Sequence, residues 1–306
     1  MAVIEVAGLR KEYRQGRRPP VVALDGLDLS VPAGGVHGFL GPNGSGKTTT
    51  IRCLLGLARP TAGTCRVLGA DPSRDYARVQ GRVGSMIETH ALFPGFTGRR
   101  NPLLLAEMAG LTGAAVEAAL DRVDLAARAD DLLATYSLGM RQRLGLAAAL
   151  MKGPELLILD EPANGLDPAG IRDIRNLLRR LGAEGRTVFV SSHLLAEVQQ
   201  MCDHVAVLRR GRCVAAGPVD DVLASVGSSG VVVRVDDIAA GLAALAAAGL
   251  PAGSDGQLIH VDVPARDSPA VAEALARQGV WPRELRPGGR SLEEAFMALT
   301  GEATPP

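Results

Sequence analysis

The residues GPNGSGKT, Gly41 to Thr48, match G-x-x-x-x-G-K-[ST], the pattern of a loop that binds the phosphates of a nucleotide. Gly41 and Gly46 allow the backbone to fold closely around an anion, and Lys47 neutralises the charge of that anion. The Thr48 hydroxyl adds an oxygen of the kind that magnesium prefers. These residue types at this spacing predict a site for a nucleoside triphosphate.

The segments on either side of this loop predict the fold around it. Val36 to Leu40 is an apolar run that indicates a buried strand, and the apolar periodicity from Lys47 to about Leu57 indicates a helix. Strand, loop and helix in this order direct free N–H groups at a phosphate. Other apolar runs predict strands over 83–87, 156–159, 187–190 and 205–208, and helical patterns cover 115–123, 140–152, 169–181 and 195–201. We therefore expect an α/β fold with a parallel core sheet, beside an N-terminal β section formed by 3–6 and 22–31.

A second stretch, LLILDEP at Leu156 to Pro162, is an apolar strand that ends in two carboxylates. Hydrolysis of ATP requires that the γ-phosphate is held, that its developing charge is neutralised and that a water is aligned behind it. We expect Asp160 and Thr48 to hold Mg²⁺, and Glu161 to orient or deprotonate the attacking water. His193 follows the strand predicted over 187–190 and is a candidate for a hydrogen bond to the γ-phosphate. Lys47, Glu161 and His193 are thus the predicted catalytic residues.

Composition counts against several other classes of protein. The 306 residues contain 33 Lys plus Arg and 33 Asp plus Glu, so no excess positive charge favours general binding to nucleic acid. The four cysteines have neither C-x-x-C spacing nor histidine partners at zinc-finger intervals, which favours a reducing cytosol over a disulfide framework. No segment reaches the roughly 18 apolar residues of a membrane span, so we expect a soluble chain.

A change of character after Gly217 and Pro218 predicts a second unit. The residues 227–230, GSSG, are typical of a linker. Strands are expected over 231–235 and 257–263, and helices over 239–248, 269–278 and 292–299. The expected division is an ATP-binding domain over 1–220 and a small α+β accessory domain over 230–306.

Further motifs follow in a fixed order, and together they resemble those of the ATP-binding subunits of ABC transporters. YSLGMRQRLG, Tyr136 to Gly145, places a Ser-x-Gly turn ahead of a helix, in the position of the family's signature. Asn164 to Asp167 matches the D-loop, and Ser192 with His193 matches the switch. The similarity covers roughly Val3 to Gly217. The form of the signature, and a C-terminal unit that ends in SLEEAFMALTG, resemble the drug-exporter ATPases of the daunorubicin or bacitracin resistance type.

The resemblance implies a P-loop ABC ATPase domain with a helical subdomain, and it implies two partners. One is a second copy, in a head-to-tail dimer in which Ser137 and Gly139 of one copy close over the ATP of the other. The other is a separately encoded membrane permease, which would place the chain at the cytoplasmic face of the cell membrane. Exposed aromatic residues in the loop from about 88 to 102 are the expected docking surface for that permease.

The same resemblance completes the expected ligand set for ATP and Mg²⁺. Tyr13 is where the family stacks an aromatic ring on adenine, and Glu88 stands where the family carries the Q-loop glutamine, as a third candidate metal ligand. The residues expected at the nucleotide are Tyr13, Gly41, Pro42, Asn43, Gly44, Ser45, Gly46, Lys47, Thr48, Thr49, Ser137, Gly139 and Asp167.

Two other functions remain open from the sequence. One is an ABC-type ATPase that acts on the ribosome or on DNA, although that class carries tandem cassettes or a long coiled-coil insertion, and this chain shows neither. The other is a nucleotide-gated regulatory module with little turnover. The pair Asp160 and Glu161 favours a hydrolase over such a module.

Overall fold

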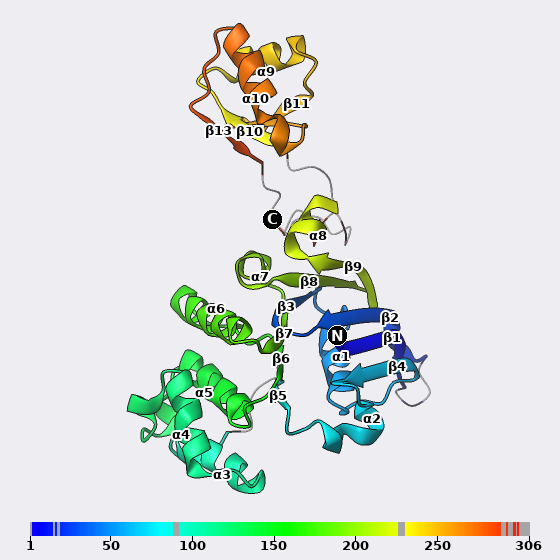
Figure 1. Ribbon diagram of the computed structural model, residues 1–306, viewed down its shortest axis with the longest axis vertical. Coiled ribbons are helices and arrows are strands. Elements are labelled where there is room, and N and C mark those ends of the chain that lie inside the picture. Colours follow the sequence, from blue (N-terminus) through cyan, green and yellow to red (C-terminus); the bar gives the residue numbers. More distant parts are fainter. Residues whose placement is uncertain are drawn as a thin grey trace. The chain divides into compact units, whose positions relative to one another are not determined.

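The computed structural model describes residues 2–14, 16, 19–87, 92–225, 230–288, 292, 296, 297 and 299. The chain divides into two compact units, Met1–Val219 and Asp220–Pro306 (Figure 1). Each unit has its own hydrophobic core. Within the described ranges, none of the helices combines the length and the apolar character that a membrane crossing requires.

The first unit is built on a six-stranded sheet in the order β5-β6-β7-β3-β8-β9. Its strands are β3 (Gly35–Leu40), β5 (Val83–Met86), β6 (Leu156–Asp160), β7 (Thr187–Ser192), β8 (His204–Arg209) and β9 (Arg212–Pro218). All neighbouring strands are parallel except β8 and β9. Every residue of β6 and β7 is buried, which explains why these strands read as continuous apolar runs in the sequence. Because the strands are parallel, the carboxyl ends of β3, β6 and β7 meet at one edge of the sheet.

A second, antiparallel sheet in the order β2-β1-β4 covers part of the first. It consists of β1 (Ala2–Tyr13), β2 (Val21–Pro32) and β4 (Ala62–Val67). The helix α1 (Lys47–Leu54) contacts β2 and β4 on one side and β6 on the other, so it lies between the two sheets (Figure 1). Large side chains from both sheets and from α1, among them Ile4, Leu24, Phe39, Ile51 and Phe189, form one buried core.

Helices complete the first unit on the other side of the large sheet. The helices α6 (Pro168–Ala183) and α7 (Leu195–Met201) both contact β3. The helices α3 (Arg100–Met108), α4 (Gly113–Arg122) and α5 (Leu138–Leu150) pack on one another as a helical group, drawn in cyan and green in Figure 1. Shorter turns are α2 (Pro72–Asp75) and the 3₁₀ segments Tyr76–Arg78, Ala126–Arg128 and Leu133–Thr135. The predicted α/β class, with a parallel core sheet, an antiparallel β section and a helical subdomain, is confirmed.

The second unit contains the helix α8 (Val219–Ser225) and an α+β module. The module runs β10 (Val231–Arg234), α9 (Ile238–Ala247), β11 (Ala252–Ser254), β12 (Ile259–Val261), α10 (Ser268–Arg277) and β13 (Glu284–Pro287), with a 3₁₀ turn at Ala265–Asp267. Its antiparallel sheet has the order β11-β12-β10-β13, so the module is a βαββαβ unit of the ferredoxin-like kind. Most of the helix predicted over 292–299 lies outside the described residues.

Candidate nucleotide-binding site

The phosphate loop connects β3 to α1, and glycine is required in it at two points. Gly46 has a φ of 113°, and a Cβ built there would lie 2.7 Å from the Ala23 carbonyl oxygen. A Cβ on Gly41 would lie 2.4 Å from the Ser45 hydroxyl oxygen and 2.7 Å from the Leu208 carbonyl oxygen. Since real Cβ atoms do not approach so closely, neither position accepts another residue without a shift of the backbone. The loop is therefore packed tightly against β2 and β8.

The side chain of Lys47 is buried, with 7% of its surface exposed. Its ammonium donates to the carbonyl oxygens of Gly41, at 2.6 Å, and Pro42, at 3.4 Å, and its Nζ lies 3.4 Å from Oε1 of Glu161. A buried ammonium needs such partners because removing it from water is costly. The charge is thus held over the loop, at the edge where β6 ends.

Ser45 supplies an observation that bears directly on a phosphate ligand. The residue is 3% exposed, and its hydroxyl oxygen is buried without a hydrogen-bond partner in the described part of the chain. Buried polar atoms are nearly always paired, so an unpaired one calls for an explanation. A hydroxyl in this loop, next to a buried ammonium, fits a phosphate oxygen as its partner. Asn43 and Gly44 are exposed at the tip of the loop, and Thr49 is half-buried at the start of α1.

Thr48 and Asp160 meet at the same edge of the sheet. The Thr48 hydroxyl donates to Oδ2 of Asp160 at 2.8 Å, although the two residues are 112 positions apart. Asp160 is the last residue of β6 and is 7% exposed, and its other carboxylate oxygen accepts from the hydroxyl of Ser191. A hydroxyl and a carboxylate that converge in this way fit Mg²⁺, which takes oxygen ligands and is usually held by one or two protein groups together with phosphates and waters.

Glu161 has an unusual backbone conformation. Its φ is 49°, in the left-handed region that costs about 1–2 kcal/mol for residues other than glycine. The conformation is held by its own N–H, which lies 3.0 Å from the Ser191 hydroxyl oxygen and 3.2 Å from the Ser191 carbonyl oxygen. Its carboxylate lies between two cationic or polar groups, Lys47 through Oε1 and Nδ1 of His193 at 2.7 Å through Oε2. Strain of this kind is typical of functional positions.

The structure therefore brings five predicted residues into one cluster: Lys47, Thr48, Asp160, Glu161 and His193. His193 follows β7, with 42% of its side chain exposed. Ser191 was not predicted as a site residue, although it contacts both carboxylate residues and is fully buried. The feature of the sequence that could have indicated it was its position, directly after the strand predicted over 187–190 and directly before Ser192 and His193.

Three other predicted residues gather in a different place. Ser137 is the N-cap of α5, where its hydroxyl accepts from the Met140 N–H at 3.2 Å, and Asp167 is the N-cap of α6, where Oδ1 accepts from the Gly170 N–H at 3.0 Å. With Gly139 and Leu166 they line a surface pocket of about 410 Å³. The residues that line this pocket do not include those of the phosphate loop. Within one copy, the residues predicted to bind the nucleotide are thus divided between two sites.

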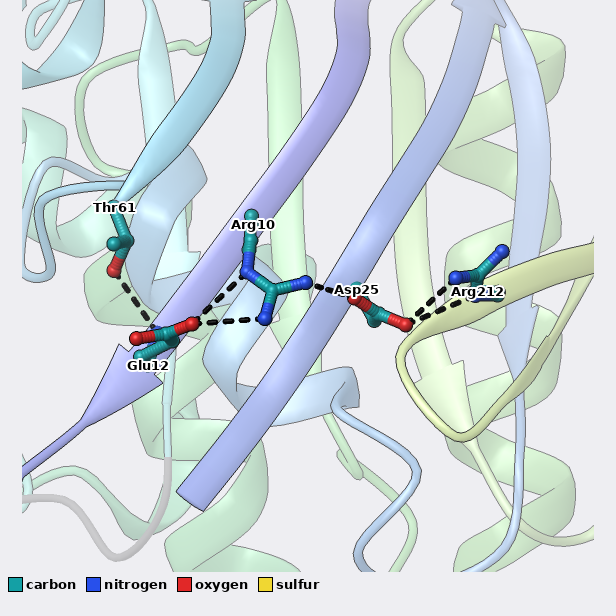
Figure 2. A network of polar contacts seen from close by, with 5 residues as sticks. All are labelled: Arg10, Glu12, Asp25, Thr61 and Arg212. Atoms are coloured by element: carbon teal, nitrogen blue, oxygen red, sulfur yellow. Dashed lines mark hydrogen bonds and ion pairs between the residues drawn. The ribbon is translucent and has the colours of Figure 1, made fainter. Parts of the chain in front are cut away.

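Tyr13 ends β1, and its ring centroid lies 4.9 Å from Nζ of Lys11. The nearby polar network in Figure 2 joins three strands: Asp25 on β2 accepts from Arg10 on β1 and, at 2.7 and 3.2 Å, from Arg212 on β9. Arg10 also binds Glu12, whose N–H donates to the Thr61 hydroxyl at 3.0 Å. The hydrogen bond from Arg212 lowers the pKa of Asp25, and that with Glu12 raises the pKa of Arg10.

This network stands beside the phosphate loop. The turn between β8 and β9 consists of Arg210 and Gly211, both with positive φ, in the arrangement of a two-residue hairpin turn. Gly211 accepts from the Asp25 N–H at 3.0 Å and donates to the Ser45 carbonyl oxygen at 2.8 Å. The strand that carries Tyr13 is thus connected to the loop through β2 and this turn. Glu88, the third candidate metal ligand, lies outside the described residues.

Comparisons with known proteins identify the family. A family model described as "ABC transporter" matches residues 24–164. The chain is 37% identical to the ABC transporter ATP-binding protein YhcH of Bacillus subtilis (strain 168), over 98% of this chain and 96% of the relative. It is 38% identical to the daunorubicin/doxorubicin resistance ATP-binding protein DrrA of Streptomyces peucetius, over 97% and 92%, respectively. It is 40% identical to the bacitracin transport ATP-binding protein BcrA of Bacillus licheniformis, over 71% and 70%.

Solved structures give the same result. An ATP-binding subunit of an ABC transporter superposes with a TM-score of 0.63 at 29% identity, over 73% of this chain and 92% of the other. CbiO1 from Clostridium perfringens, part of the ABC transporter complex CbiONQ, gives a TM-score of 0.65 at 28% identity, over 73% and 91%. From its loop, its carboxylate pair, its fold and these relatives together, the chain belongs to the ATP-binding subunits of ABC transporters, and it is an ABC-type ATPase.

Proposed function

We propose that this chain is the ATP-hydrolysing subunit of an exporter, that it dimerises on ATP, and that it drives a separately encoded permease. The observation that carries the proposal is the cluster at the carboxyl edge of the large sheet. There, Lys47 and His193 hold the carboxylate of Glu161, and Thr48 contacts Asp160. A cation, a pair of candidate metal ligands and a carboxylate that can position a water lie at one edge, and these are the parts that phosphoryl transfer to water needs.

Each residue has a distinct task in this proposal. Lys47, the Ser45 hydroxyl and the N–H groups from Asn43 to Thr48 bind the β- and γ-phosphates, where the N-terminus of α1 favours negative charge. Thr48 and Asp160 hold Mg²⁺, with Glu88 as a further candidate, and the metal supplies charge neutralisation at the phosphates when bound. Tyr13 packs on the adenine ring.

Glu161 orients the attacking water and accepts its proton. In the structure its two carboxylate oxygens face Lys47 and His193. When the γ-phosphate is present, Lys47 and His193 have a stronger anion to bind, which leaves Glu161 free to hold the water. His193 then holds the γ-phosphate, so its contact reports whether that phosphate is present.

A second copy of the chain completes the site. The pocket at Ser137, Gly139 and Asp167 lies at the N-terminus of α5, where no acidic residue occupies the first turn of the helix. Its wall carries Arg143 as well as two acidic residues of the α6 region, Asp167 and Asp173. The Ser137 hydroxyl caps one N–H of that turn, and an anion can bind the others. The γ-phosphate held by the loop of a partner copy is such an anion. ATP would then be bound from both sides, and its hydrolysis would loosen the dimer.

The permease would dock on the loop that precedes α3. Phe93 and Phe96 are 56% and 40% exposed, with ring centroids 5.3 Å apart, and Leu132 nearby is 49% exposed. Exposed apolar residues that gather in this way suit a helix of a partner protein. The exported substrate would be a drug, an antibiotic or a lipid-like molecule, and the names of DrrA and BcrA support the first two. The chain would lie at the cytoplasmic face of the membrane. The ATP-binding domain spans 1–220, and the accessory domain, 230–306, supports or regulates the dimer.

The substitution Glu161→Gln tests the proposal. It keeps the size of the side chain but removes the base, so turnover should fall by at least about 100-fold while ATP binding persists. With Mg-ATP the variant should accumulate as a dimer in analytical ultracentrifugation. Glu155→Gln, which changes an exposed carboxylate paired with Arg82, is the control and should hydrolyse ATP normally. A Glu161→Gln protein that stays monomeric with saturating Mg-ATP, alone and with its permease, would rule out the proposed mechanism.

A further inference from the structure

The loop before α3 and the segment before α5 are joined by their backbones. The Leu133 N–H donates to the Phe96 carbonyl oxygen at 2.9 Å, and the Ala134 N–H to that of Pro94 at 3.2 Å. In the other direction, the Gly98 N–H donates to the carbonyl oxygen of Asp131 at 3.0 Å, and the Arg99 N–H donates to the carbonyl oxygen of Ala129 at 2.7 Å. Residues 94–99 and 129–134 therefore form one hydrogen-bonded layer. We call the loop that contains the first of these stretches the docking loop (92–99), and the segment that contains the second the pre-signature segment (129–136).

The side chain of Asn101, in the first turn of α3, also holds the docking loop in place. This residue is 3% exposed, and its amide oxygen accepts from the Phe93 N–H at 2.7 Å. Its amide nitrogen donates to the carbonyl oxygens of Phe93, at 3.2 Å, and Thr97, at 3.0 Å. Since a buried amide with three hydrogen bonds has little freedom, the exposed aromatic pair stands on a rigid support.

The closest contact between the two segments involves Gly98 and Tyr136. Tyr136 is 3% exposed, and its hydroxyl donates to the Arg128 carbonyl oxygen at 2.6 Å. A Cβ on Gly98 would lie 1.8 Å from that hydroxyl oxygen and 2.6 Å from Cζ of the ring. The φ of Gly98 is not positive, so glycine is needed here for space and not for backbone conformation. The phenol thus occupies the volume that any side chain at position 98 would fill.

Tyr136 is covalently joined to the N-cap of α5, Ser137. A shift of the Tyr136 ring therefore moves the turn that is proposed to bind the partner's nucleotide. The preceding turn, Leu133–Thr135, is tied to the docking loop by the hydrogen bonds above, and Nη2 of Arg141 donates to the Ala134 carbonyl oxygen at 3.4 Å. The docking loop is thus joined to the residue before the signature turn by backbone hydrogen bonds and by the seat of the Tyr136 ring.

We propose that Tyr136, seated against Gly98, is a positioning residue for ATP hydrolysis, because it fixes the Ser137 turn to the docking loop. The inference rests on the proposed function, in which Ser137 acts on the nucleotide of a partner copy. It assigns no chemical step to Tyr136. The residue sets where Ser137 stands, so that a partner bound at Phe93 and Phe96 acts on the signature turn through one rigid layer.

A purely structural role would look different in an assay. The phosphate loop lies in another part of the fold, on β3 and α1, so displacement of the Ser137 turn should leave ATP binding by the loop unchanged. Turnover should fall, because it requires the turn at the nucleotide of the partner copy. A merely destabilising change would instead lower the unfolding midpoint and reduce the amount of active protein, with the kcat per active molecule unaltered.

The experiment compares Gly98→Ala with Gly95→Ala in the full-length chain. Both glycines lie in the docking loop and neither has a positive φ, but a Cβ on Gly95 has no atom within 4 Å. We expect Gly98→Ala to lower kcat on the order of 10-fold to 100-fold, the scale that a displacement of about 1 Å produces. The Kd for ATP, measured without magnesium, should stay within about twofold of the wild type. Gly95→Ala should match the wild type in both quantities.

Tyr136→Phe is the second variant, in case Gly98→Ala does not fold. It keeps the ring but removes the hydrogen bond to Arg128, so a smaller loss of kcat is expected, again without a change in the Kd for ATP. A wild-type kcat in folded Gly98→Ala or in Tyr136→Phe overturns the inference, and so does an equal loss in Gly95→Ala. These outcomes are distinct from failure of the proposed function, in which Glu161→Gln would stay monomeric with saturating Mg-ATP.

Discussion

At the scale of single residues, the candidate site depends on one serine as much as on its carboxylates. The Ser191 hydroxyl donates to Asp160 and lies against the N–H of Glu161, so a single oxygen fixes the last residue of β6 and the first residue after it. The hydrogen bond to the charged Asp160 is worth about 1.5–3 kcal/mol, and that from the Glu161 N–H about 0.5–1.5 kcal/mol, which is comparable with the cost of a left-handed backbone. The geometry of the proposed metal ligand and of the proposed base is thus set on the neighbouring strand.

Replacement of Ser191 by Ala should separate activity from stability. We expect kcat to fall about tenfold or more, because Asp160 and Glu161 both lose their fixed orientation, while the Kd for ATP changes little. The matched control is Thr187→Val at the opposite end of β7. The Thr187 side chain is also buried, and its hydroxyl accepts from the Gly34 N–H at 2.8 Å.

Both variants should lose a similar amount of stability, about 1–3 kcal/mol in chemical denaturation. Only Ser191→Ala should lose turnover. Equal kcat values in the two variants would show that Ser191 supports the fold alone.

At the scale of elements, the register between β3 and β8 places two histidines opposite each other. His37 pairs with His204, their rings stack with centroids 5.1 Å apart, and Nε2 of His37 lies 2.7 Å from the Gly34 carbonyl oxygen. Burial lowers the pKa of His37 from its ordinary value of 6.5, more than the hydrogen bond to Gly34 raises it. The folded state therefore favours the neutral ring.

The lowered pKa of His37 should make the folded protein less stable at acidic pH. Below about pH 6.5 the unfolded chain binds a proton at His37 that the folded chain does not, so stability decreases as the pH falls toward the folded pKa. His37→Gln should remove this part of the dependence. The measurement is the unfolding midpoint in denaturant at about pH 8 and about pH 6. An identical shift between the two pH values in wild type and variant would contradict the assignment.

The elements also show where sequence patterns are informative. The buried central strands, β3, β6, β7 and β8, were predicted from apolar runs, because a strand covered on both faces must be apolar throughout. The edge strands β11 and β13 were missed. Their sequences, AGS and ELRP, have no apolar run, because an edge strand is partly solvated and depends on one neighbour for its pairing. The helix α3 was missed too, since Pro102 interrupts its pattern near the start.

For the site, the residues inside short motifs were predictable and the contacts between distant residues were not. The spacing of GPNGSGKT identifies Lys47 and Thr48 without knowledge of the fold. Nothing in the sequence pairs Asp25 with Arg212, which are 187 positions apart, or places Gly98 under Tyr136. Such contacts depend on the exact course of β2, the β8–β9 turn and the pre-signature segment, and a motif carries no information on these.

At the scale of the whole molecule, each unit has a core of its own. Among the described residues, a core cluster of the first unit runs from Ile4 to Leu208, and the βαββαβ module buries Val231, Leu245, Ile259 and Leu275 among its own residues. A unit whose apolar residues are buried within itself can fold alone. We therefore expect the first unit to build the phosphate loop without the accessory domain.

Deletion of Gly230 to Pro306 should leave a folded protein that binds ATP with a Kd within about twofold of the full-length value. If the accessory domain supports the dimer, the shortened chain carrying Glu161→Gln should dimerise only at higher protein concentration. Circular dichroism, nucleotide titration and analytical ultracentrifugation measure these three properties. Loss of ATP binding in a soluble shortened chain would contradict the independence of the units, and unchanged dimerisation, turnover and transport would remove the role proposed for the accessory domain.

The backbone of Glu161 has one more consequence, for protein engineering. Glycine and asparagine adopt a φ of 49° more easily than glutamate does, so position 161 is a place where a single substitution relieves strain. The relief of strain, about 1–2 kcal/mol, is set against the ion pair with Lys47 that the same substitution removes. A protein without this carboxylate would, under the proposed role of Glu161, no longer hydrolyse ATP.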